Sequence, residues 1–208
     1  MKKIIITFTI CLFTLSCIAQ NKATFKQTEG YSGKKLPFIT ETEFENIQIN
    51  NELALQTIME PNSIKKVVSK LGTPKNIEDK KDRAVDETVI FETKIINYPD
   101  LTFYYPLNNI YEISSIDINS DDYYFCLKDR KIRVGMSIND ILDTLINTLD
   151  NESLERGKAL LYVFQSNKAG KLKRTTSGNI AGGYRYIRFE FNPQTKIVTK
   201  ISIVFVVP

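Results

Sequence analysis

Two stretches of this sequence place apolar residues at the same helical spacing behind a serine, one at Ser63 and the other at Ser137. In each stretch the apolar residues fall at i, i+3, i+4 and i+7, which forms one stripe of an amphipathic helix. The two stripes are Ile64, Val67, Val68 and Leu71, and Ile138, Ile141, Leu142 and Leu145. The spacing predicts two helices, each with its serine as the N-cap.

The ends of these helices are also marked in the sequence. Gly72 stands where a left-handed residue would end the first helix, and Pro74 prevents its continuation. At the second helix, Asp140 lies three residues after the serine and completes a variant of the capping box.

Each predicted helix precedes three runs of alternating, β-branched or aromatic residues, which predict strands. The runs lie at 88–98, 100–106 and 110–119, and at 158–167, 184–193 and 196–207. The middle runs match in detail, because Phe103 and Tyr105 before a proline correspond to Phe189 and Phe191 before another. We therefore expect an α+β protein with two tandem helix-then-antiparallel-sheet repeats, with the helices packed on one face of each sheet.

The repeats are expected at 38–128 and 129–208, joined by an extra run at 121–129. A short strand is also expected at 44–49, where apolar residues alternate. The preceding segment, 20–37, is polar and contains two glycines and a proline, which predicts a flexible tether.

Two short motifs resemble the ends of one family signature. Gly135-Met136-Ser137 and Leu71-Gly72-Thr73-Pro74 are similar to the G-M-[ST]…LG-x-P signature of BamE-like (SmpA/OmlA) lipoproteins and of the related β-lactamase-inhibitor-like fold. Neither copy has the complete signature, since Pro61-Asn62 precede the first helix and Ile146-Asn147 follow the second stripe. The resemblance covers nearly all of 50–208. It implies a tandem-repeat fold, an envelope location and action by binding other proteins, and it carries over no functional residue.

The first twenty residues have the layout of a secretory signal peptide. Lys2 and Lys3 precede an uncharged run from Ile4 to Ser16, which is short for a membrane-spanning helix. Two processing outcomes are open: cleavage after Ala19, which makes 1–19 the signal, or lipidation of Cys17 in a lipobox-like motif, which makes it 1–16. Either outcome predicts an exported protein, in the periplasm after cleavage at Ala19, or anchored to the outer membrane after lipidation of Cys17. A lipid anchor is the only membrane contact that we expect.

The charge balance and the number of cysteines limit which partners and which kind of stabilisation we expect. The chain has 28 basic and 24 acidic residues, and two of the basic ones lie in the signal. A nearly neutral mature protein gives no electrostatic basis for binding nucleic acid. Cys126 is the one cysteine beyond the signal region, so no disulfide within the chain is expected and a packed core must stabilise the fold.

The sequence contains no histidine, which removes the commonest general base and transition-metal ligand. We therefore expect no enzymatic activity, no cofactor and no metal site. One catalytic pattern remains: Ser63 and Lys66 form an S-x-x-K like that of penicillin-recognising serine enzymes. It supports an alternative function as a small envelope serine hydrolase or transpeptidase. The helix-cap interpretation is favoured, because Ser137 stands at the equivalent position with Asp140 in place of the lysine.

A second pattern resembles the start of an EF-hand loop, with Asp117, Asn119 and Asp121 at positions 1, 3 and 5. Position 6 is Asp122 where glycine is required, and position 12 is Lys128 where glutamate is required. The favoured interpretation is a polar turn after a strand.

Two surfaces are candidates for binding a partner. A basic loop contains Lys168, Lys171, Lys173 and Arg174, and it is either an arm that contacts an acidic partner or a solvated hairpin insertion. The other candidate is the sheet face opposite the inward phenylalanines. It would carry Tyr104, Tyr186, Arg188 and Glu190, with Tyr111, Tyr123 or Tyr162 beside them.

Tyrosine and arginine anchor many protein interfaces, although the same tyrosines could simply shield the sheet. The function we expect is a non-enzymatic module that binds an envelope or secreted protein, as an inhibitor, an immunity-type protein or an assembly accessory. A glycan- or peptide-binding module is a further alternative.

Overall fold

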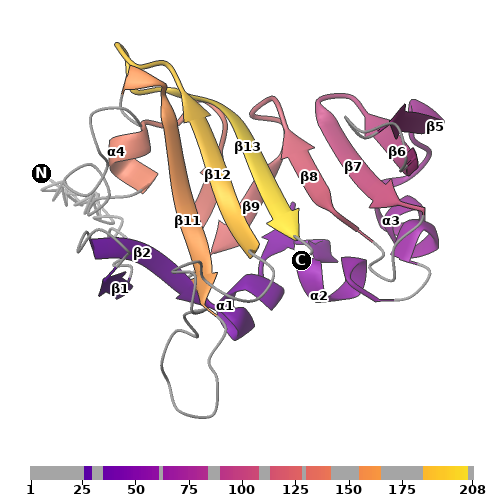
Figure 1. Ribbon diagram of the computed structural model, residues 1–208, viewed down its shortest axis with the longest axis horizontal. Coiled ribbons are helices and arrows are strands. Elements are labelled where there is room, and N and C mark those ends of the chain that lie inside the picture. The colour runs from indigo at the N-terminus through magenta and orange to yellow at the C-terminus, as the bar shows by residue number, and fades with distance from the viewer. Residues whose placement is uncertain are drawn as a thin grey trace, which may run out of the picture.

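The computed structural model describes residues 26–29, 35–60, 63–83, 90–107, 113–127, 130–141, 155–164 and 185–205. Within them the chain forms a nine-stranded sheet in the order β1-β2-β11-β12-β13-β8-β7-β6-β5 and a four-stranded sheet in the order β10-β9-β3-β4 (Figure 1). The strands of the large sheet are β1 (Lys26–Glu29), β2 (Lys35–Thr40), β11 (Lys158–Phe164), β12 (Arg185–Phe191), β13 (Val198–Phe205), β8 (Ser115–Ile118), β7 (Leu101–Pro106), β6 (Ile90–Tyr98) and β5 (Asn76–Arg83). Those of the small sheet are β10 (Arg130–Arg133), β9 (Tyr124–Leu127), β3 (Gln48–Ile49) and β4 (Leu53–Ala54). The described helices are α1 (Glu41–Glu45), α2 (Leu55–Ile58), α3 (Ser63–Leu71) and α4 (Ile138–Ile141).

Each of the six predicted strand runs contains a strand within its described residues. They form two meanders, β6-β7-β8 and β11-β12-β13, whose last strands pair with each other. At this junction Ile201 lies opposite Ile118, and Ile203 lies opposite Ile116. Neighbouring strands of the large sheet are antiparallel, apart from the parallel pair β2 and β11.

The prediction of two tandem helix-then-sheet repeats is wrong. The protein is mostly β, and α3 is the only described helix longer than five residues. Joining the meanders at β8 and β13 satisfies backbone groups that two separate sheets would leave unpaired at their edges. The resulting apolar face is wide, and a second sheet covers it together with short helices. The small sheet itself combines β9 and β10, which pair across the expected boundary at 128/129.

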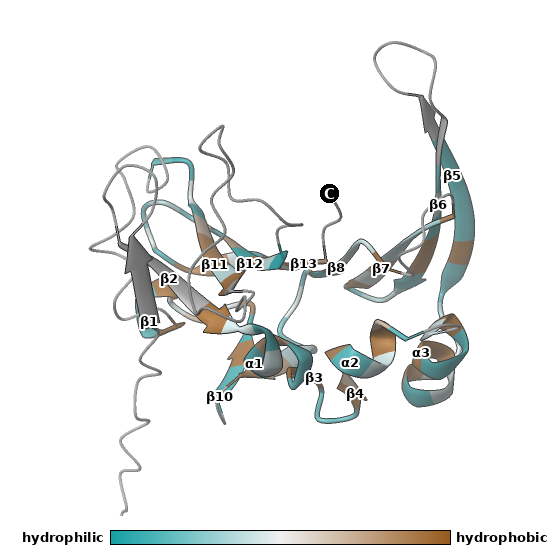
Figure 2. Cartoon of the chain, turned by 60° about the horizontal axis from the view of Figure 1, so that its bottom comes forward, coloured by the Kyte–Doolittle hydropathy of each residue, from teal (hydrophilic) through white to brown (hydrophobic). Residues whose placement is uncertain are grey.

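One hydrophobic core fills the space between the two sheets. Phe125 of β9 stacks on Phe189 of β12, with 6.5 Å between ring centroids. Phe44 of α1 packs edge-on against Phe205 of β13, at 5.3 Å. Figure 2 shows α1, α2, α3 and the small sheet on the same side of the large sheet. The helices and the small sheet thus cover one face of the large sheet, and its other face is the candidate surface for binding a partner.

The first predicted helix is confirmed as α3. Val67 is fully buried, and Ile64 and Leu71 pack against the core. Gly72 has a φ of +81°, and its N–H donates to the Val68 carbonyl at 2.9 Å, as expected for a left-handed helix end. The Tyr98 hydroxyl donates to the Gly72 carbonyl at 3.0 Å and so fastens this helix end to β6.

The second predicted helix begins as α4, in which Ile138 and Ile141 are buried. The hydroxyl of Ser137 accepts a hydrogen bond from the Asn139 N–H at 3.3 Å, which is a capping contact. Leu142 and Leu145 lie outside the described residues.

The strand expected at 44–49 is wrong in its first part. The Thr40 hydroxyl accepts from the Glu43 N–H, and the Glu43 carboxylate accepts from the Thr40 N–H, so a capping box begins α1 at Glu41. Phe44 therefore lies on a helix, and only Gln48 and Ile49 form a strand. An ion pair of 2.9 Å between Glu41 and Arg185 fastens α1 to β12.

The beginning of the chain is described only in part. Residues 26–29 and 35–37, within the segment expected to be a tether, belong to β1 and β2. The expected signal peptide and Cys17 lie outside the described residues. No helix in the described part of the chain is both long and apolar enough to span a membrane.

Candidate protein-binding face

The face of the large sheet opposite the core is built by strict alternation along its central strands. In β12, Ile187, Phe189 and Phe191 point into the core. Tyr186, Arg188 and Glu190 alternate with them and point to the other side. We call this second side the open face. Tyr104 of β7 belongs to it as well, because the neighbouring Phe103 and Tyr105 are buried in the core.

The strand register arranges the open face in rows that run across the strands. One row consists of Tyr186, Val204, Ser115 and Tyr104, on β12, β13, β8 and β7. Three strand spacings separate its two tyrosines, which amounts to about 14 Å. Tyr162 of β11 lies opposite Tyr186 and extends the row by one strand. Tyr104, Tyr186 and Tyr162 therefore form one line across the sheet.

The next row is polar and consists of Arg188, Ser202, Asp117 and Thr102. Ser202 is only 1% exposed and Asp117 only 9%, although both point away from the core. Longer neighbours account for this burial: Arg188 Nη2 donates to Ser202 Oγ at 3.3 Å, and Lys200 Nζ lies 2.8 Å from Asp117 Oδ2. Arg188 and Glu190 are themselves about one-third exposed, at 33% and 32% of their side chains, and are 3.3 Å apart.

Tyr104 and Asp117 connect the two rows. Burial raises the pKa of Tyr104, and the Asp117 carboxylate raises it further through its charge and a hydrogen bond from the tyrosine hydroxyl. The Tyr104 hydroxyl therefore keeps its proton over a wider pH range than a free tyrosine and acts as a hydrogen-bond donor on this face. Tyr104 is half-buried.

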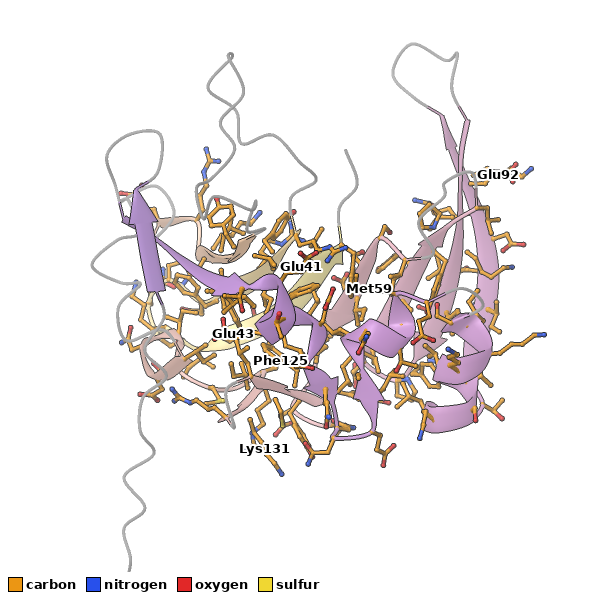
Figure 3. The ribbon with its side chains drawn as sticks, turned by 90° about the horizontal axis from the view of Figure 1, so that it is seen from below. Glu41, Glu43, Met59, Glu92, Phe125 and Lys131 are labelled. Carbon is orange, nitrogen blue, oxygen red and sulfur yellow. The ribbon has the colours of Figure 1, made fainter. Side chains whose placement is uncertain are left out.

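The large sheet curves toward the open side at its far end. Figure 2 shows the β5–β6 hairpin projecting on the side away from the helices. Its two strands form an antiparallel ladder, and ion pairs of 2.6 Å also join them, between Lys94 and Asp79 and between Lys81 and Glu92, of which Figure 3 labels Glu92. The hairpin therefore forms a raised border along one side of the open face.

The sequence also suggested Tyr123 and Tyr111 for this face, and neither is among the described residues of its rows. Tyr123 packs against the hydrophobic core, and its influence on the pKa of Tyr98 places it near that core residue. It is therefore not part of the rows described above. Tyr111 lies outside the described residues, as do Lys168, Lys171, Lys173 and Arg174 of the basic loop.

The serine–lysine pattern occupies the start of α3. Ser63 is only 1% exposed, and Lys66 forms an ion pair with Glu60. A buried hydroxyl whose lysine neighbour pairs with a carboxylate is poorly placed to attack a substrate. This environment fits a serine that begins a helix.

The residues that resemble a calcium loop are divided between a strand and a turn. Asp117 lies in β8 and pairs with Lys200, whereas Asn119 and Asp121 follow the strand. Nowhere in the described ranges do three or more Cys, Asp or Glu residues gather closely enough to hold a metal ion.

Sequence reasoning did not identify the ion pair between Lys200 and Asp117 or the burial of Ser202. Alternation along β13 places Lys200, Ser202 and Val204 on one side, but their partners depend on the register between β13 and β8.

Comparison with family models, with curated proteins and with solved structures finds no match for this chain.

Proposed function

We propose that this protein is a non-enzymatic module of the cell envelope that binds a partner protein through the open face. The observation that carries the proposal is the line of Tyr186 and Tyr104 across four adjacent strands, beside the partly exposed Arg188. Tyrosine and arginine contribute strongly to protein interfaces because each combines a large contact area with hydrogen-bonding groups.

The chemistry of the face favours a protein partner of mixed polarity. Its charges are neutralised locally, since Arg188 lies beside Glu190 and Lys200 pairs with Asp117. Ser115 lies between the tyrosines of the first row, and Thr102 lies in the polar row beside it. Tyrosine with small hydroxyl residues is the combination found in antibody paratopes, where it binds folded protein surfaces.

An envelope location belongs to the same proposal and depends on the signal-like first twenty residues. Within the envelope, an inhibitor or immunity-type role would place a toxin or hydrolase on the open face. An assembly role would place a component of a larger complex there.

Partner capture with a matched pair of variants tests the proposal. The face variant combines Tyr104→Ala, Tyr186→Ala and Arg188→Glu. The control variant is Arg133→Glu, which makes the same charge reversal at an exposed arginine on the outer side of the small sheet. Tagged forms would be crosslinked in the native envelope, and captured proteins identified by mass spectrometry and then purified for binding measurements.

We expect the wild type and the control variant to bind the same purified partner, and the face variant to bind at least about tenfold more weakly, as for loss of interface anchors. Circular dichroism would establish that both variants remain folded. Undiminished binding by the folded face variant would contradict the proposal.

A further inference from the structure

A groove lies on the opposite side of the molecule, between α1 and the outer side of the small sheet. It has a volume of about 560 Å³, and its lining residues are Glu43 of α1, Asn46 at the end of α1, Gln48 of β3, Asn51 of the following turn, Cys126 and Leu127 of β9, and Lys131 of β10. We call it the α1 groove. Its volume is within the range of about 300–1,000 Å³ that ligand pockets usually have.

The fold holds the walls of the α1 groove in fixed positions. Gln48, Cys126 and Lys131 lie directly opposite one another on three adjacent strands. The next row, Ile49, Phe125 and Ile132, is fully buried and anchors the same strands to the core (Figure 3). The outward row therefore sits on a rigid support.

The turn and the helix that complete the groove are also fastened. Asn50 and Asn51 both have left-handed backbones, with φ of 51° and 57°. Asn50 Oδ1 accepts from the Tyr124 N–H at 3.0 Å, and Asn51 Oδ1 accepts from Cys126 Sγ at 3.0 Å. On the helix, Glu43 Oε2 accepts from the Thr40 N–H at 2.8 Å.

These contacts engage acceptor atoms of the groove and leave donors available. With its oxygen engaged, Asn51 presents its amide N–H groups. Lys131 has no carboxylate partner among the described residues, and its ammonium lies 4.5 Å from the centroid of the Tyr124 ring. Asn46 and Gln48 are exposed, and within the described ranges their carboxamides form no hydrogen bond. The groove thus combines the Lys131 ammonium and several amide donors with the Glu43 carboxylate, whose Oε2 is engaged by Thr40 in the helix cap.

From this arrangement we infer that the α1 groove binds a short acidic peptide segment. A glutamate or aspartate carboxylate would pair with the Lys131 ammonium and accept from the Asn51 amide. The carboxamides of Asn46 and Gln48 would pair with peptide groups, because each offers a donor and an acceptor side by side, as a peptide bond does. The site is separate from the open face, so its occupancy does not depend on the proposed function.

Titration of the mature protein with designed probes tests this inference. The first probe is an N-acetylated, C-amidated tetrapeptide of alternating serine and glutamate, and the second has glutamine in place of glutamate. Trigalacturonic acid is the third probe and carries carboxylates on a saccharide. Affinities would be measured by calorimetry at low and high salt. The rate at which iodoacetamide alkylates Cys126 would be followed by mass spectrometry.

We expect the glutamate peptide to bind, to slow the alkylation of Cys126, and to bind more weakly as salt screens Lys131. Lys131→Gln should weaken its affinity at least about tenfold, because a charge-assisted hydrogen bond is lost. The matched variant Lys65→Gln, on the exposed side of α3, should leave it unchanged.

Three results would each overturn the inference: equal affinity for the glutamine peptide, equal effects of Lys131→Gln and Lys65→Gln, or tighter binding of trigalacturonic acid than of the glutamate peptide. The face variant of the previous section should bind the glutamate peptide as tightly as the wild type does. If Lys131→Gln alone weakens this binding, the α1 groove and the open face are independent sites.

Discussion

Gly157 lies immediately before β11, where the chain passes close to the end of β12. Its carbonyl accepts a hydrogen bond from the Phe191 N–H at 2.8 Å, and its φ is +62°. A Cβ atom at this position would lie 2.0 Å from the Phe191 carbonyl oxygen. Both the backbone conformation and the space at this position therefore require glycine.

Gly157→Ala is expected to destabilise the protein more than Gly72→Ala does. Gly72 also has a positive φ, but a Cβ atom there would have no neighbour within 4 Å. Gly72→Ala should therefore lower the free energy of unfolding by about 1 kcal/mol, the cost of a left-handed alanine. Gly157→Ala should cost about 1–3 kcal/mol more, because the strands must also move apart. Urea denaturation followed by circular dichroism measures both, and equal losses would show that β11 and β12 separate freely at this point.

Single residues were predicted well where a local rule determines them. Gly72 follows from helix-ending rules, and the outward direction of Tyr104 and Tyr186 follows from alternation along a strand. The ion pair between Lys200 and Asp117 could not be predicted in the same way, because it joins two strands whose register is set by the core.

Among the elements, long alternating strands were predicted and short or distant ones were not. Each of the six runs of the two meanders contains a strand within its described residues, and α3 is a helix. In contrast, β4 has two residues, too few for alternation to reveal, and β3 was predicted only as the end of a longer strand at 44–49. The parallel pairing of β2 with β11 joins segments more than a hundred residues apart, and no local pattern specifies such a contact. The signal for α1 was present at Thr40 and Glu43 as a capping box.

The small sheet is fastened to the large one chiefly through buried side chains, and Phe125 tests this attachment. Phe125→Ala should lower the free energy of unfolding by about 3–5 kcal/mol, because it removes the stack on Phe189 and leaves a cavity between the sheets. The adjacent Tyr124→Ala changes a side chain on the outer side of the same strand and should cost about 1 kcal/mol or less.

Equilibrium denaturation in urea distinguishes the two variants of β9. If both lose the same stability, the small sheet is attached by something other than the layer of phenylalanines. The alkylation rate of Cys126, which lines the α1 groove, provides a further check. Phe125→Ala should raise this rate, because β9 opens more often when its buried anchor is lost.

The molecule as a whole has one continuous core, although its sequence suggested two repeated units. The two meanders share the junction of β8 and β13, so residues from both halves of the chain form neighbouring rows of the same core. The small sheet adds a second junction, because β9 and β10 pair on either side of residue 128. Similar local patterns in the two halves therefore describe similar strands, and the contacts between the halves determine the fold.

A shared core predicts that the protein unfolds in one step and that neither half folds alone. Fragment 38–128 would lack β13 beside β8, and fragment 129–208 would lack β9 beside β10, so each would expose an unpaired strand edge and an uncovered apolar face. For the whole protein, urea transitions followed by far-ultraviolet circular dichroism and by tyrosine fluorescence should coincide, as two-state unfolding requires. The separate fragments should show no cooperative transition, whereas mixing them should restore one if the edges find each other. A fragment that unfolds cooperatively by itself would show that half of this sheet and its covering elements suffice for a core.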